Sequence, residues 1–190
     1  LQSVKQRPDL LQAAAAVLDQ VCIGTDTRRD SASVALQVAI RHPGLVRNLV
    51  FASAMTAREG AYPQLWEFMK GADIANMPQS LKDAFLRVTP DAQRLKNMHD
   101  KDAERMQNFV DVPEAAVRAV KARALVVVGD QDIVKPEHAL AVTRLIPGAR
   151  LLVLPGGHGD YLGELINTPK GSRYPALTAA LIEEFLDGHA

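Results

Sequence analysis

The stretch SASVALQVAIRHPGLVRNLVFASA, from Ser31 to Ala54, decides the fold class of this chain. In its first half, apolar residues recur at helical spacing and stop at the sequence HPG, which predicts a helix capped by Asp30 or Ser31. The second half, LVRNLVFASA, is a largely apolar run, which is typical of a strand buried in a parallel sheet. A helix that leads directly into such a strand indicates a fold in which helices and strands alternate.

The same alternation continues on both sides of this stretch. Downstream, ALVVVGDQD (124–132) and ARLLVLPGG (149–157) predict two more strands. Between them we expect a helix with Pro136 at its start and Pro147-Gly148 after its end, and a last helix at 174–188. Upstream, apolar residues at helical spacing predict a helix over 8–24. We therefore expect an α/β fold, in which a mostly parallel sheet is flanked by helices on both faces.

Residues 55–120 break this alternation. They contain no convincing strand but several short amphipathic helical stretches, separated by Pro, Asn and Gly. We predict an all-helical insertion here, so that residues 1–54 and 121–190 form the core. The insertion is either a small bundle that stabilises the core or a cap over an apolar pocket, and the two interpretations are compatible. The side chains that we expect on the wall of such a pocket are Met55, Trp66 and Met69.

Two polar segments follow neighbouring strands of the predicted sheet. GDQD places Asp130 and Asp132 where one strand ends, and LPGGH places His158 just after the next. Open α/β sheets bind ligands at this carboxyl edge, and a carboxylate there can fix the tautomer of a histidine that acts as a general base. The alternative is local: Asp130 forms a turn, Asp132 caps the following helix, and His158 is an ordinary loop residue.

The order of these segments resembles the α/β-hydrolases that carry a helical cap. The resemblance rests on VALQVAIRHPGLVRNLVFASA, the helical insertion, GDQDIVKPEHA and LPGGHGDYLGE, and it runs along nearly the whole chain. It implies an enzyme without a cofactor that hydrolyses an ester or a similar small, apolar acyl compound through an acyl-enzyme. It also implies that Asp132 is the acid and His158 the base of a serine triad.

One part of the family pattern is missing. The family has a G-x-S-x-G turn whose nucleophilic serine would stand five residues before Val34, but Arg29 occupies that position and flanking glycines are absent. Arginine stays protonated and cannot serve as the nucleophile. Ser31 and Ser33 are the nearest hydroxyls, and Ser31 is either a nucleophile in a shifted turn or a helix cap. The first strands of the family fold are also lacking and the chain begins at Leu1, so we expect a processed or partial product.

These observations leave three hypotheses open. The first is a serine hydrolase of which the sequence is a partial view. The second is a non-catalytic member of the family that binds a small molecule in the pocket without turnover. The third is an interaction protein, because the strand predicted at 45–54 would have an unpaired apolar edge that could pair with a second copy in a homodimer.

Composition argues against several other classes of protein. The chain has 190 residues, 47% of them hydrophobic, and a net charge of zero, which gives no field to attract nucleic acid or an anionic membrane. Cys22 is the single cysteine, no apolar run reaches the length of a membrane span, and no signal peptide opens the chain, so we expect a cytoplasmic protein. The histidines lack the spacing of metal ligands, and HDKD (99–102) is typical of a solvated helix face.

Overall fold

The computed structural model of the chain describes residues 21–23 and 31–188. Its centre is a four-stranded sheet with the order β1-β2-β3-β4, in which each pair of neighbouring strands is parallel. The strands are β1 (Val21–Ile23), β2 (Asn48–Ala52), β3 (Arg123–Gly129) and β4 (Arg150–Leu154). The predicted α/β class and parallel sheet are confirmed.

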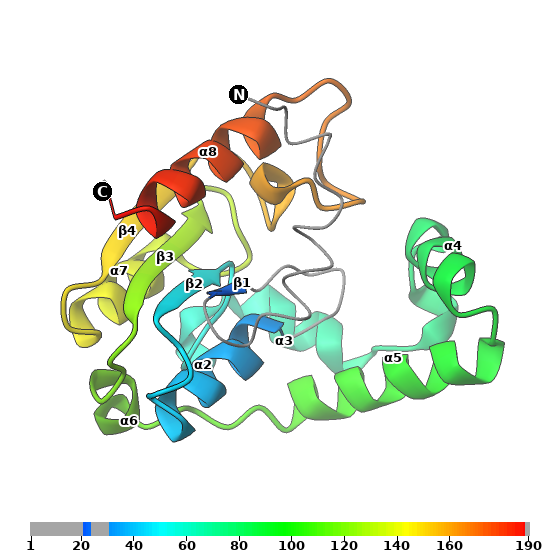
Figure 1. The fold of residues 1–190 in the computed structure, drawn as a ribbon. Coiled ribbons are helices and arrows are strands. Elements are labelled where there is room, and N and C mark those ends of the chain that lie inside the picture. The colour runs from blue at the N-terminus through cyan, green and yellow to red at the C-terminus, as the bar shows by residue number, and fades with distance from the viewer. Residues whose placement is uncertain (1–20, 24–30, 189–190) are drawn as a thin grey trace.

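Helices cover both faces of this sheet (Figure 1). One face packs against α2 (Ser31–Arg41), α6 (Glu114–Arg118) and α7 (Pro136–Leu145). The other packs against α8 (Tyr174–Leu186) and the short 3-10 helix η5 (Asp160–Leu162). Burial on both faces explains why the central strands read as continuous apolar runs rather than as an alternating pattern.

Successive residues of the central strands enter opposite halves of the core. Phe51 of β2 and Val126 of β3 belong to the apolar cluster under α2 and α7, whereas Val50 and Val127 pack with Phe185 of α8. This period of two follows from strand geometry. Because each strand must bury the correct side chains on each face, the pairing of β2, β3 and β4 is fixed. The loops that follow these strands therefore leave the sheet at a common edge.

The segment proposed as the insertion is mainly helical. It contains α3, α4 and α5, of which α4 and α5 extend away from the sheet in Figure 1. Its elements are η3 (Arg58–Gly60), α3 (Pro63–Lys70), η4 (Ile74–Asn76), α4 (Gln79–Val88) and α5 (Ala92–Gln107). Helix α6 lies within the range predicted for the insertion, but Val117 and Val120 are buried in the core cluster.

Two expectations at the start of the chain need correction. Val21 was predicted to lie near the end of a helix but belongs to β1. The prediction failed because a run of three apolar residues is too short for its periodicity to distinguish a strand from a helix. β1 pairs with β2 along Asn48–Val50, so β2 is not the unpaired edge that the homodimer hypothesis assumed. The rest of the predicted helix over 8–24 lies outside the described residues. The edges of the described sheet are β1 and β4, and a homodimer stays a prediction.

Candidate active site

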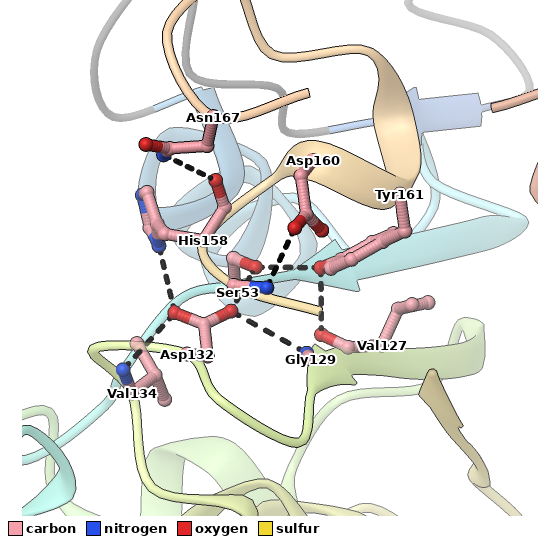
Figure 2. A network of polar contacts seen from close by, with 10 residues as sticks. Ser53, Val127, Gly129, Asp132, Val134, His158, Asp160, Tyr161 and Asn167 are labelled. Carbon is pink, nitrogen blue, oxygen red and sulfur yellow. Dashed lines mark hydrogen bonds and ion pairs between the residues drawn. The ribbon is translucent and has the colours of Figure 1, made fainter. Parts of the chain in front are cut away.

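Asp132 and His158 lie side by side at the carboxyl edge of the sheet (Figure 2). β3 and β4 pair in register up to Gly129 and Leu154, so the loops that follow these strands leave the sheet next to each other. One loop carries Asp132 and the other His158, and the Nδ1 atom of His158 is 2.8 Å from Oδ1 of Asp132. The two residues that the sequence singled out are thus in direct contact.

The surroundings of Asp132 keep its carboxyl group ionised. The residue is only 3% exposed, and this burial alone raises the pKa of the carboxyl. Hydrogen bonds from His158, Ser53 and the backbone N–H of Val134, together with the charge of His158, outweigh burial and leave the pKa below its ordinary value. A carboxylate can only accept hydrogen bonds, so His158 donates from Nδ1 and its neutral ring keeps Nε2 as the acceptor.

Glycine is required where the two loops approach each other. A Cβ atom on Gly129 would lie 2.3 Å from the backbone oxygen of Gly156 and 2.6 Å from that of Gly157. Gly156 has a φ of +130°, a conformation that residues with a side chain rarely adopt. These glycines of GDQD and PGGH therefore let the Asp132 loop and the His158 loop touch.

Each aspartate of GDQD also accepts a hydrogen bond from a backbone N–H, although the N-cap of α7 is Lys135 and not Asp132, as the alternative interpretation expected. Oδ1 of Asp130 accepts a hydrogen bond of 2.8 Å from the backbone N–H of Gly156, which ties the two loops together. Oδ1 of Asp132 accepts one of 3.1 Å from the N–H of Val134, two residues on, as in an Asx turn. The local role of Asp132 thus accompanies its contact with His158.

A pocket of about 570 Å³ opens beside this pair, between the core and the helical insertion. His158 and Ser53 line it from the core, and its wall is mainly apolar. The insertion contributes aromatic and long aliphatic side chains, among them Leu65, Phe68, Met69, Leu81, Met106 and Phe109. A pocket of this size with a few polar groups on one wall suits a small organic ligand.

The predicted pocket residues divide into two groups. Met55 and Met69 line the pocket. Trp66 does not, because it packs behind the wall: its ring centroid is 5.6 Å from that of Phe109, and the guanidinium of Arg58 lies 4.1 Å above the ring. Its indole N–H donates to the backbone oxygen of Arg58 at 3.0 Å. Trp66 thus contacts Phe109, which does line the pocket.

The segment HDKD is only in part the solvated helix face that the sequence predicts, because Asp100 and Lys101 are exposed but His99 is buried. His99 is 6% exposed and lines the pocket, as do Asp102 and Arg105. Helical spacing places His99 on the same face of α5 as the buried Leu95, and α5 packs against α3. Asp100, one residue further on, lies on the exposed side. Because the four residues are all polar, their composition did not reveal that His99 lies on the buried face of α5.

The segment in which the resemblance expects the nucleophile lies where the described residues begin again at Ser31. Arg29 falls outside the described residues. Ser31 is the first residue of α2, but its side chain lies outside the described part. Ser33, two residues further along α2, lines the pocket. Within 21–23 and 31–188, no group of three or more His, Cys, Asp or Glu side chains could hold a metal ion, and no helix has the length and apolarity needed to cross a membrane.

Sequence reasoning missed Ser53 and Tyr161. The hydroxyl of Ser53, which directly follows β2, donates a short hydrogen bond to Oδ2 of Asp132. The hydroxyl of Tyr161 lies 2.6 Å from that of Ser53. A usable signal was present, because Ser53 follows a strand at the same carboxyl edge as Asp132 and His158.

Solved structures similar to this chain are hydrolases and a lactonase. The enol-lactonase from Burkholderia xenovorans has a TM-score of 0.58 at 14% identity, with 97% of this chain and 73% of that chain covered. A meta-cleavage product hydrolase from Pseudomonas fluorescens has a TM-score of 0.54 at 17% identity, covering 92% and 68%. A thermophilic esterase from Thermogutta terrifontis has a TM-score of 0.54 at 18% identity, covering 83% and 61%. No protein-family model and no curated protein sequence matches the chain.

Proposed function

We propose that this chain, which has the α/β-hydrolase fold, binds a small, mainly apolar ester or similar acyl compound in the pocket and hydrolyses it. The observation that carries the proposal is the 2.8 Å hydrogen bond between the buried Asp132 and His158, which lines that pocket. The apolar side chains of the insertion would hold the acyl chain, and the polar wall would face the ester group.

In the proposed reaction, Nε2 of His158 takes the proton from a serine hydroxyl while the hydroxyl oxygen attacks the ester carbonyl. Asp132 stabilises the imidazolium that forms and keeps the ring in place. His158 then returns the proton to the departing alcohol, which leaves an acyl-serine. Water, deprotonated by the same ring, hydrolyses this intermediate and releases the acid. Ser31, at the start of α2, is the serine we assign to this step.

A second candidate function is binding without turnover. It is favoured by one observation in the sequence: Arg29 stands where the resemblance expects the nucleophilic serine. Without a nucleophile, serine proteases lose on the order of a million-fold in turnover, although their acid and base remain. The pocket would then retain its ligand and the pair would have no hydroxyl to activate.

Hydrolysis of 4-nitrophenyl butyrate, followed by the release of 4-nitrophenol, tests the proposal. We expect turnover by the wild-type chain that is lost in Ser31→Ala and in His158→Gln, and retained in Ser80→Ala, a control on the exposed surface of α4. Butyrate binding, measured by calorimetry, separates the two functions. Binding without any turnover in the wild-type chain would support the second function and contradict the first.

A further inference from the structure

Ser53 has a backbone conformation that is unfavourable for its residue type. It extends β2 by one hydrogen bond, from its N–H to the backbone oxygen of Val127 at 2.9 Å. Its φ is +45°, and among the described residues it is the only non-glycine residue with a positive φ. A side chain at such a φ crowds the backbone, so glycine would fit this position better. The presence of a serine at this φ indicates that its side chain has a functional role.

That side chain lies between Tyr161 and Asp132. The Ser53 hydroxyl has one hydrogen, which it donates to Oδ2 of Asp132. Its 2.6 Å contact with the hydroxyl of Tyr161 is then made by the tyrosine hydrogen. Tyr161 is fully buried, and burial raises the pKa of its phenol well above the ordinary value, so this hydrogen stays in place. The same phenol lies 3.4 Å from the backbone oxygen of Val127.

These contacts link four side chains in the order Tyr161, Ser53, Asp132 and His158 (Figure 2). Tyr161 and His158 belong to the loop after β4, Asp132 to the loop after β3, and Ser53 to the end of β2. His158 donates to Oδ1 of Asp132 and Ser53 donates to Oδ2, so each carboxylate oxygen has a side-chain donor. The carboxylate cannot turn without breaking one of these bonds.

We propose that Ser53 and Tyr161 are positioning residues, which hold the Asp132 carboxylate so that Oδ1 stays aligned on Nδ1 of His158. The proposal deepens the proposed function and rests on it for its effect on hydrolysis. Ser53 is assigned this role and not that of nucleophile, because its hydrogen is on Asp132, whereas His158 contacts the other carboxylate oxygen.

Three variants remove the hydroxyls of the two positioning residues: Ser53→Ala, Ser53→Gly and Tyr161→Phe. Ser53→Gly is the informative one, because it removes the hydroxyl and also the side chain that makes the positive φ unfavourable, so poor folding cannot explain its effect. The matched control is Thr178→Val, which removes a buried hydroxyl that has no hydrogen-bond partner among the described residues.

The first readout is the titration of the His158 ring, followed by NMR at its Cε1–H and assigned with His158→Gln. A carboxylate in contact raises the pKa of a histidine, so a loosened Asp132 lowers the titration midpoint. We expect the midpoint to fall in Ser53→Ala, Ser53→Gly and Tyr161→Phe and furthest in Asp132→Asn, and to stay at the wild-type value in Thr178→Val. This readout needs no turnover, so it remains valid if the proposed function fails.

The second readout is hydrolysis of 4-nitrophenyl butyrate. We expect kcat/KM to fall about tenfold in both Ser53 variants, as for one lost hydrogen bond to a charged group, and less in Tyr161→Phe, which loses a bond to a neutral hydroxyl. An unchanged His158 midpoint in both Ser53→Ala and Ser53→Gly would overturn the proposal. So would an equal change in Thr178→Val, or a fluorophosphonate label found on Ser53, which would make that residue a nucleophile.

Discussion

The Nδ1 atom of His158 lies 2.8 Å from Oδ1 of Asp132, and the two residues belong to loops that follow neighbouring parallel strands. Their contact follows from the register of β3 and β4, which brings the two strand ends together, and from Gly129, which lets the loops touch. The chemistry of the site therefore depends on backbone packing at the carboxyl edge of the sheet.

Gly129→Ala should destabilise the fold and separate the acid from the base. The added methyl group would lie 2.3 Å from the backbone oxygen of Gly156, and backbone at that point cannot move without shifting the His158 loop. We expect the free energy of unfolding in urea to fall by about 1–3 kcal/mol, the usual cost of overpacking. Gly44→Ala is the matched control, since nothing lies within 4 Å of its added Cβ. Equal stability of the two variants would contradict the packing argument.

Asp132→Asn should make the free energy of unfolding less dependent on pH in the acidic range. The pKa of Asp132 is lower in the folded chain than its ordinary value, so its contribution is complete above about pH 4 and is lost as the pH falls through the folded pKa. The wild-type free energy of unfolding should therefore fall more steeply below pH 4 than that of Asp132→Asn. Urea unfolding across this range measures the difference, and parallel curves would argue against an ionised, hydrogen-bonded Asp132.

His138 should make the junction between core and insertion sensitive to pH. Its Nε2 accepts a hydrogen bond of 3.0 Å from the N–H of Thr56, and burial lowers the pKa of the ring. A lowered folded pKa means that the contribution is complete above about pH 6.5 and is lost as the pH falls below it. His138→Gln keeps an acceptor that does not titrate, so its unfolding free energy should vary less between about pH 6.5 and 5.

The exposed His42 provides the control for that experiment. His42→Gln removes a histidine on the surface and should leave the wild-type dependence on pH unchanged in the same urea titrations. A loss of pH dependence in His42→Gln as large as in His138→Gln would show that the junction is not its source.

Ala103→Phe should weaken ligand binding in proportion to the length of the acyl chain. Ala103 lines the pocket from α5, so a phenyl group there removes part of its volume. Calorimetry with acetate, butyrate and hexanoate should show the largest loss for hexanoate, because the longest chain needs the most space. Ala92→Phe, at the exposed start of the same helix, should bind all three like the wild-type chain. An equal loss for acetate and hexanoate would place the acyl chain elsewhere.

Local sequence patterns were sufficient to predict most of the architecture and to single out Asp132 and His158, which the structure brings into contact. The strands β2, β3 and β4 are apolar runs between turn residues, and the helices of the insertion have their own amphipathic spacing. Asp132 and His158 were recognisable because each follows such a strand, and parallel strands end at a common edge. This reasoning needs only the order of elements along the chain.

The remaining features depend on contacts that the local sequence does not specify. The three residues of β1 gain their strand conformation by pairing with β2. The positioning role proposed for Ser53 was not predictable, because it rests on a positive φ and on a contact with Tyr161, which is distant in the sequence. The predictions for Trp66 and His99 were wrong because the packing of α3 against α5 decides which face of each helix is buried. Composition alone does not reveal that direction.

The most direct test of the proposed function is labelling with a fluorophosphonate, followed by mass-spectrometric mapping of the labelled residue. A hydroxyl activated by His158 attacks the phosphorus and displaces fluoride, which leaves a stable adduct. We predict a single label, on Ser31, that disappears in His158→Gln and slows strongly in Asp132→Asn. A wild-type chain that binds butyrate in the pocket and yet takes up no label would contradict hydrolysis by this pair.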